Sequence, residues 1–120
     1  MTGTQKKKLD SLWSEAVRTR DLKCRRCGKT SSLQGAHIFS RRSRSTRWDL
    51  DNGVTLDVGC HLYWAHMEPV KFTRFLEGLL GKPFLKKLEL KNNQVVKNQD
   101  YETIKAGLET AIKRFTETVR

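Results

Sequence analysis

The sequence has no apolar run long enough to cross a membrane, and no apolar stretch follows its charged start as in a secretory signal. We therefore expect no membrane partner and a cytoplasmic location. Internal repeats, low-complexity tracts and linkers are lacking as well. An undivided chain of 120 residues has room for a single domain, residues 1–120, with one modest core.

Acidic residues are scarce, with 13 Asp and Glu against 24 Lys and Arg, and the formal net charge is +11. Residues 1–47 carry 13 basic and 3 acidic side chains, whereas residues 48–120 carry 11 and 10. A surplus of this size favours a polyanionic partner, because neutralising phosphates supplies most of the sequence-independent affinity for nucleic acid. A solvated basic face that only keeps the protein soluble is the alternative.

Cysteine is also rare, and the chain has only Cys24, Cys27 and Cys60. An odd count with a Cys-x-x-Cys spacing favours metal ligation over disulfides in a reducing compartment. Three thiolates leave a tetrahedral zinc ion one ligand short. Gly28 follows the pair, where a knuckle around a metal needs a left-handed residue.

Hydrophobic periodicity predicts an α+β fold, with strand, loop and strand running into a helix. Two short strands are predicted, one at 33–39 and one beginning at Val54, after an Asn52-Gly53 turn signal. Helices are predicted where apolar residues recur at helical spacing or start and stop signals occur: 9–20, from 62, 69–80, 84–90 and 100–120.

The histidines and cysteines fall into one pattern, which runs Cys24-x-x-Cys27, Ala36-His37-Ile38, Asn52 and Cys60-His61. This order resembles an HNH nuclease. The resemblance implies a ββα-metal core with a structural zinc knuckle. In that family the first-strand histidine is the general base, the asparagine orients it and pins the loop, and the histidine that starts the helix binds a divalent ion such as Mg²⁺ or Mn²⁺. These catalytic roles fall on His37, Asn52 and His61.

The segments Ala-His-Ile-Phe-Ser-Arg, Asp-Asn-Gly and Gly-Cys-His are similar to a phage-type subgroup of that family. The resemblance covers about residues 24–80. It implies a core at 24–68, a helical C-terminal extension at 69–120 and a phage protein in the cytoplasm of a bacterial host.

Position 36 departs from the family pattern, because many members carry a metal-ligating His or Asp directly before the base and Ala36 offers none. His66 is a candidate second ligand beside His61, although a spacing of four would share a helix face more squarely than five. An exposed surface role is the alternative for His66. Asp49, Asp51 or water are further candidates, since Mg²⁺ accepts oxygen ligands.

Position 57 departs as well, because Asp57 stands where the family usually has the first cysteine of the second pair. Zinc accepts carboxylate oxygen, so Cys24, Cys27, Asp57 and Cys60 are predicted to hold structural Zn²⁺, with lower affinity than four thiolates. The alternative is an exposed carboxylate beside a weak or empty site.

The loop after the predicted base carries four arginines, Arg41, Arg42, Arg44 and Arg47. Guanidinium groups fork onto phosphate oxygens, so these residues are predicted to bind DNA, with a merely solvated loop as the alternative.

Together these features predict a metal-dependent HNH endonuclease that nicks one DNA strand at a time. No small-molecule substrate is implied, and we expect a monomer. The apolar stripe of residues 100–120 suits either a cover for the core or a dimer or partner contact. A zinc-knuckle DNA-binding module without activity is the competing prediction. No base-reading helix stands out, so DNA sequence specificity is not predicted.

Overall fold

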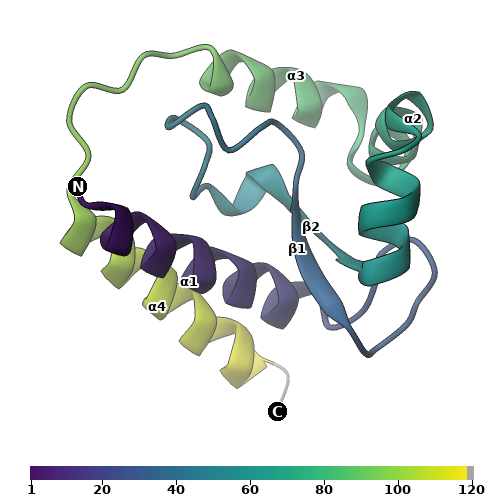
Figure 1. Cartoon of the computed structure of the whole chain (residues 1–120), viewed down its shortest axis with the longest axis horizontal. Coiled ribbons are helices and arrows are strands. Elements are labelled where there is room, and N and C mark those ends of the chain that lie inside the picture. The colour runs from purple at the N-terminus through teal and green to yellow at the C-terminus, as the bar shows by residue number, and fades with distance from the viewer. Residues whose placement is uncertain (119–120) are drawn as a thin grey trace.

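A two-stranded antiparallel sheet surrounded by helices forms the fold, and the computed structural model describes residues 1–118 (Figure 1). The elements, in chain order, are α1 (Gly3–Asp21), β1 (Leu33–His37), the 3₁₀ turn η1 (Leu50–Asn52), β2 (Gly53–Asp57), the π-helix η2 (Gly59–Ala65), α2 (Pro69–Leu80), α3 (Lys82–Asn92) and α4 (Tyr101–Thr118). The predicted α+β class is confirmed. Positions 119 and 120 of the last predicted helix lie outside the described residues.

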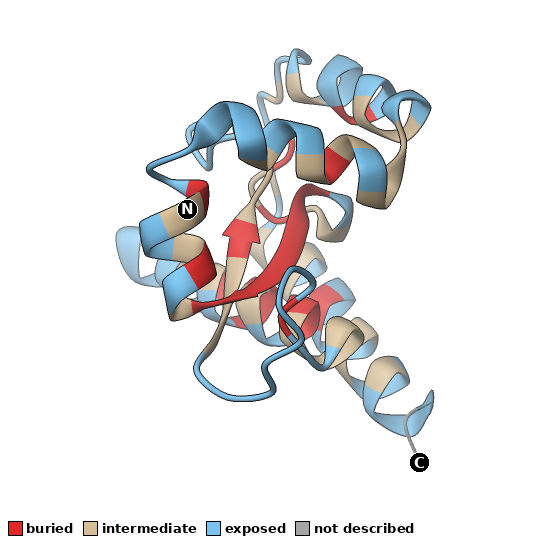
Figure 2. Ribbon diagram, turned by 90° about the vertical axis from the view of Figure 1, so that its right-hand side faces the viewer, coloured by how far each residue is buried: buried red, intermediate tan, exposed pale blue. Residues whose placement is uncertain are grey.

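The sheet pairs Leu33 with Asp57 at one end and His37 with Gly53 at the other. Strand β2 is buried along its whole length, and Figure 2 shows it enclosed by the helices. Strand β1 ends at His37, two residues before the predicted end, because the backbone of Phe39 bonds to the side chain of Asn52 instead of the sheet.

The predicted turn into the second strand is the 3₁₀ turn η1, which ends at Asn52, and not a tight two-residue hairpin turn. Gly53 has extended backbone angles and begins β2 directly after η1. A Cβ atom on Gly53 would lie 2.5 Å from the ring of Trp13 and 2.8 Å from Val17. Glycine is therefore needed here for the close approach of α1 rather than for a turn.

Helix α1 begins six residues earlier than predicted, because Thr2 and Gln5 form a capping box at its start. The extra turns are polar and could not be found from apolar spacing. Near its other end the guanidinium of Arg20 donates to the carbonyl oxygens of Leu50 and Gly53, at 2.7 and 2.8 Å. These bonds fix α1 against the start of β2.

Helices α1 and α4 lie side by side, with α1 between α4 and the sheet (Figure 1). One core cluster joins these helices to the loop before η1, and its buried members are Leu9, Leu12, Trp13, Val17, Trp48 and Leu108. The other lies where β1, β2, η2 and α2 meet. The apolar stripe predicted for the last helix thus covers α1.

Among residues 1–118, no helix has both the length and the apolar character needed to span a membrane.

Candidate functional site

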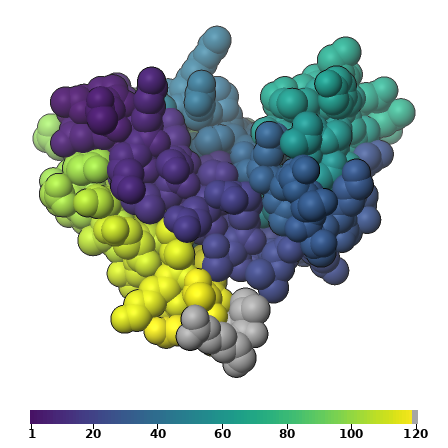
Figure 3. Space-filling model, turned by 60° about the horizontal axis from the view of Figure 1, so that its bottom comes forward, coloured from purple at the N-terminus to yellow at the C-terminus, as the bar shows by residue number. Residues whose placement is uncertain are grey.

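A cleft of about 510 Å³ brings together His37, His61 and His66, which are far apart in the sequence. Its walls come from α1, β1, the loop after β1 and η2, and the remaining lining residues are Asp10, Trp13, Ser14, Gly35, Ser40 and Arg41. Figure 3 shows the surface hollowed between the protruding blue loop at the top and the teal elements. The three histidines of the chain therefore share one opening.

His37 is held on two sides. Its ring stacks on Trp13, with 3.8 Å between centroids and planes 5° apart, and its Nε2 lies 2.9 Å from the carbonyl oxygen of Arg47. Because a carbonyl only accepts, Nε2 carries the proton of the neutral ring and Nδ1 keeps a free lone pair. Burial lowers the pKa of His37 below its ordinary 6.5, so the ring is neutral at pH 7.

Asn52 is fully buried and ties together the loop that follows His37. Its side-chain oxygen accepts from the Phe39 N–H at 2.7 Å, and its amide donates to the carbonyl oxygens of Phe39 and Thr46, each at 3.0 Å. Its carbonyl oxygen accepts from Ile38. Asn52 thus fixes the backbone on both sides of the loop, and within residues 1–118 its side chain forms no hydrogen bond to a histidine.

His61 is oriented by β1. Its Nδ1 lies 2.8 Å from the side-chain oxygen of Gln34, which accepts, so Nδ1 carries a proton and Nε2 remains an acceptor. Burial is the main cause that lowers its pKa, followed by repulsion from His66 and His37. A neutral imidazole with one free nitrogen is the form that ligates metals.

The π-helix η2 brings His66 next to His61. The His66 N–H donates a hydrogen bond to the carbonyl oxygen of His61, five residues earlier, at 3.2 Å. The two rings are 4.7 Å apart and nearly perpendicular. The spacing of five, which suits an α-helix poorly, therefore fits one turn of this wider helix. The His66 side chain is exposed, so it is not part of the buried core.

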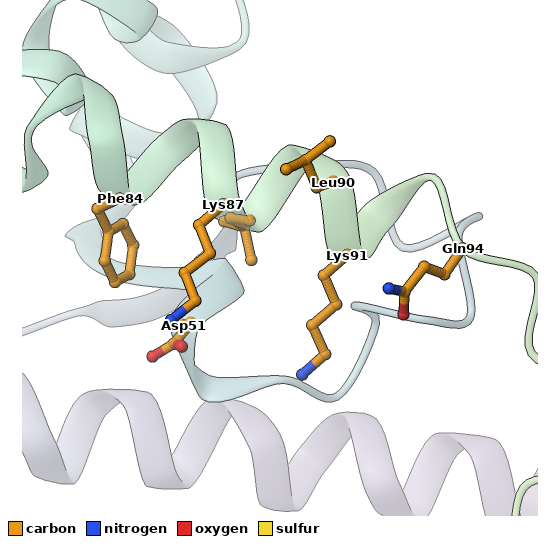
Figure 4. A pocket seen from close by; sticks show the side chains of 7 residues that line it. Asp51, Phe84, Lys87, Leu90, Lys91 and Gln94 are labelled. Carbon is orange, nitrogen blue, oxygen red and sulfur yellow. The ribbon is translucent and has the colours of Figure 1, made fainter.

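Aspartates 49 and 51 do not line the histidine cleft. Asp49 pairs with Lys91. Asp51 lines a separate cavity of about 460 Å³ between α3 and η1, toward which Lys87 and Lys91 point (Figure 4). That cavity has no imidazole or thiol in its lining. Ala36 is buried and offers no ligand, so the position before His37 contributes none.

Asp10 is the carboxylate of the histidine cleft, and sequence reasoning missed it. It binds Arg47 at 3.0 and 2.8 Å through both oxygens and also accepts from the indole of Trp48 at 2.9 Å. Burial opposes its ionisation, but the bonds from Arg47 and Trp48 outweigh burial and hold the pKa of Asp10 below its ordinary value. Asp10 therefore fixes the residue whose carbonyl holds His37.

This pairing changes the expectation for Arg47, because its guanidinium fork is occupied by Asp10 and is not free for phosphate. Arg41, Arg42 and Arg44 are exposed. The loop that carries them is anchored by Asn92, which accepts from Ser45 and Thr46, and by Gln99, which donates to the carbonyl of Arg44. Three arginines thus remain available on a fixed loop.

A possible metal centre lies at the other end of the sheet. One ligand atom from each of Cys24, Cys27, Asp57 and Cys60 lies within 4.8 Å of the others. A tetrahedral zinc with Zn–S bonds of about 2.3 Å needs sulfurs about 3.8 Å apart, so the set is placed to hold a metal and is consistent with structural zinc. The competing prediction of an exposed Asp57 is wrong, since Asp57 is buried.

The backbone around this centre has the form of a knuckle. The Gly28 N–H donates to the Cys24 carbonyl, and Gly28 has the predicted left-handed φ of +82°. One oxygen of Asp57 accepts from the Cys60 N–H at 3.0 Å, while the other contacts the Cys27 sulfur at 2.6 Å. The carboxylate is thus held in place through one oxygen and offers the other to a metal.

Ionisation of the four groups is uneven. Hydrogen bonds from the Cys27 thiol and the Cys60 N–H hold the pKa of Asp57 far below its ordinary value, so it is a carboxylate at neutral pH. Burial raises the pKa of Cys60 to about 12. Metal binding at this centre would therefore release thiol protons and become weaker as the pH falls.

Trp13 was also missed as a site residue, because its apolar spacing in α1 only indicated a core position. A signal was present, since Asp10 and Trp13 are three residues apart and share one helix face. What the sequence does not give is that this face packs on β1.

Comparison with protein-family models, with curated proteins and with solved structures finds no match.

Proposed function

We propose that this protein is a metal-dependent endonuclease of the HNH type, built on a ββα-metal core, that nicks DNA. The observation that carries the proposal is the free Nδ1 of a neutral His37 in the same cleft as His61 and His66. A base and a pair of metal-ligating imidazoles in one cleft are what hydrolysis of a phosphodiester requires.

In this proposal His37 takes a proton from the attacking water through Nδ1. The carbonyl of Arg47 holds the proton on Nε2 and stabilises the imidazolium that forms. Trp13 fixes the plane of the ring by stacking on it. Asn52 acts through the loop backbone and is a positioning residue.

His61 and His66 would hold the catalytic divalent ion, and its role is to stabilise charge on the phosphate and the leaving oxygen. The fit is sparse, because the cleft offers the two imidazoles of His61 and His66, while its one carboxylate among the described residues, Asp10, is paired with Arg47. Waters and phosphate oxygens would complete the shell. Imidazole donors suit transition metals such as Ni²⁺ better than Mg²⁺ or Mn²⁺, which prefer oxygen ligands, so Ni²⁺ belongs in the assay beside the two expected ions.

Arg41 is the arginine best placed for the substrate, because it lines the histidine cleft and forms no ion pair among residues 1–118. We propose that it holds the scissile phosphate by its guanidinium fork. Arg42 and Arg44 extend the same basic loop.

The test is a supercoiled plasmid incubated with the zinc-loaded protein alone or with Mg²⁺, Mn²⁺ or Ni²⁺. We expect nicked circles before linear DNA, since one site cuts one strand at a time. His37→Ala should lose about 10²-fold or more in rate, and His66→Ala should need more metal for half-maximal rate. Met67→Ala, an exposed neighbour of His66, serves as the control.

Metal-dependent nicking that survives in His37→Ala would exclude the proposed site. Binding without nicking in every metal would favour the second candidate, a zinc-knuckle DNA-binding module without activity. The buried Ala36, and the pairing of the cleft's carboxylate Asp10 with Arg47, favour that candidate. Salt-titrated binding of DNA by His37→Ala measures this activity separately.

A further inference from the structure

A second cleft, of about 450 Å³, adjoins the histidine cleft along the first turns of α1. The side chains that matter in its lining are Lys6, Lys7, Asp10, Arg41, Arg42 and Arg47. Asp10 and Arg41 also line the histidine cleft. The two clefts thus share a wall, and the second, called the basic cleft below, has no histidine in its lining.

The charge of the basic cleft is one-sided. Its one carboxylate, Asp10, is already paired with Arg47. Within the described part of the chain, Lys6, Lys7, Arg41 and Arg42 form no ion pair. By contrast, Lys71, Lys82 and Lys91 on α2 and α3 each pair with an acidic side chain. Four uncompensated cations therefore gather beside the proposed active site.

The chemistry of the lining points to phosphate rather than to bases. No aromatic ring or side-chain amide is among its lining residues, so stacking on bases and reading of base edges are not provided for. Lysine and arginine side chains around an open cleft suit a row of phosphate oxygens.

We propose that the basic cleft binds the phosphodiester backbone of DNA beside the scissile bond, with Lys6 and Lys7 contacting phosphates on one side of it only. The proposal rests on the proposed function for the position of the scissile bond. It adds a second binding site, on α1, to the arginine loop, and it sets the course of the strand across the protein.

Equilibrium binding tests the site without any chemistry. A DNA duplex is titrated with His37→Ala protein, with and without Lys6→Ala/Lys7→Ala, from 50 to 200 mM salt and without added divalent ion. Two lost phosphate contacts should reduce the slope of log affinity against log salt by about 1.8. The loss of affinity across that salt range should shrink by about tenfold.

Two controls match the charge that is removed. Lys86→Ala/Lys87→Ala takes two adjacent exposed lysines from α3, and Lys7→Ala is compared singly with Lys8→Ala, whose residue is next on α1 but does not line the cleft. We expect the control slopes to stay near that of the parent. Equal slopes for Lys6→Ala/Lys7→Ala and Lys86→Ala/Lys87→Ala would overturn the proposal. The lysines would then contribute to DNA binding only through the net charge of the protein and not through contacts in the basic cleft.

A nicking experiment tests whether Lys6 and Lys7 contact the DNA on one side of the scissile bond only. End-labelled duplexes are shortened from either side of a mapped nick and cut by the protein with and without Lys6→Ala/Lys7→Ala. Shortening the duplex on one side of the nick should abolish the difference in nicking rate between the two proteins. Shortening it on the other side should leave that difference unchanged. A difference that persists on both sides would overturn the proposal.

The two proposals fail separately. If the protein nicks no DNA but Lys6 and Lys7 control the salt slope, the nuclease function falls and the backbone site stands. If it nicks DNA through His37 but the slope does not respond to Lys6 and Lys7, the nuclease stands and the basic cleft is not its binding site.

Discussion

The indole of Trp13 lies parallel to the imidazole of His37 at 3.8 Å between ring centroids. The indole N–H donates to the carbonyl of Asp49 at 2.8 Å, so the ring that supports His37 is itself fixed to the loop before η1. This relationship makes α1 part of the candidate site, and it decides how the site responds to change.

Replacing Trp13 by Phe should weaken both stability and the proposed nicking. The smaller ring removes the indole bond to the Asp49 carbonyl, which still accepts from the Asn52 N–H, and leaves a void in a buried position, so the free energy of unfolding should fall by about 1–3 kcal/mol. Denaturant titration measures this, and the nicking rate should fall at temperatures where the variant stays folded. A variant with unchanged stability would mean that the indole bond and the packing around it contribute nothing.

Gly53→Ala should destabilise the protein, because its Cβ would lie 2.5 Å from the Trp13 ring and 2.8 Å from Val17. Overpacking of this kind costs about 1–3 kcal/mol. Gly107→Ala on α4 is the matched control, since its added Cβ meets nothing within 4 Å and alanine favours a helix. Thermal unfolding should separate the two variants in opposite directions from the parent.

Asp10→Asn should reduce nicking about tenfold while leaving the fold intact, because the Arg47 carbonyl that holds His37 loses its ionic anchor. Acid stability should change too. The folded pKa of Asp10 is lowered, so the ion pair stabilises the protein above pH ~4 and this contribution is lost as the pH falls through the lowered pKa. Denaturation from pH 5 to 2 should show a shallower loss in Asp10→Asn than in the parent. Asp51→Asn is the control. If Asp10→Asn lost stability with falling pH as steeply as the parent does, the expected role of the Asp10 ion pair would be contradicted.

His37 should make stability depend on pH near neutrality. Facing Asp10, Arg41, Arg47 and His61, it has a folded pKa below 6.5, so its contribution is full above 6.5 and is lost as the pH falls and the unfolded chain takes up the proton. His37→Gln should flatten the loss between pH 7 and 5, by up to ~1.4 kcal/mol per pH unit. Part of the slope should remain, since His61 acts with the same sign. An unchanged slope would contradict the burial of His37.

Asp57→Cys should bind zinc at least about tenfold more tightly than the parent, and Asp57→Ala more weakly, because a thiolate is a better zinc ligand than a carboxylate. Competition with a chromogenic chelator measures the affinity. At saturating zinc a tenfold gain in affinity stabilises the folded protein by about 1.4 kcal/mol, which thermal unfolding detects. Asp51→Ala should behave as the parent, and equal zinc affinities in all variants would refute the four-ligand centre.

The sequence predicts that Cys24, Cys27, Asp57 and Cys60 lie together as a possible metal centre, because this depends on residue type, spacing and the order of elements, and the structure places them so. The same order of elements groups the three histidines in one cleft. It does not predict which carboxylate reaches the histidine cleft. Asp49 and Asp51 are nearer to His61 along the chain, but Asp10 arrives from α1 through packing that no local pattern reveals. In the same way, apolar spacing cannot distinguish a π-helix from an α-helix, so the fit of His66 over His61 had to be seen in the structure.

The Asn52-Gly53 pair shows how one signal serves different purposes. The dipeptide is common in tight turns, but here asparagine ties a loop and glycine admits an indole. Residue identity was informative in both cases, while the reason for Gly53 depended on α1, more than thirty positions upstream.

Helix α1 is translated before α4, yet one of its flanks is covered by α4. On the ribosome, Leu9 and Leu12 therefore lack their final cover until Leu108 has left the exit tunnel. The support that Asp10 and Trp13 give to His37 should accordingly form late. A nascent chain interrupted before residue 101 carries all three histidines, but the helix that positions His37 lacks its packing against α4.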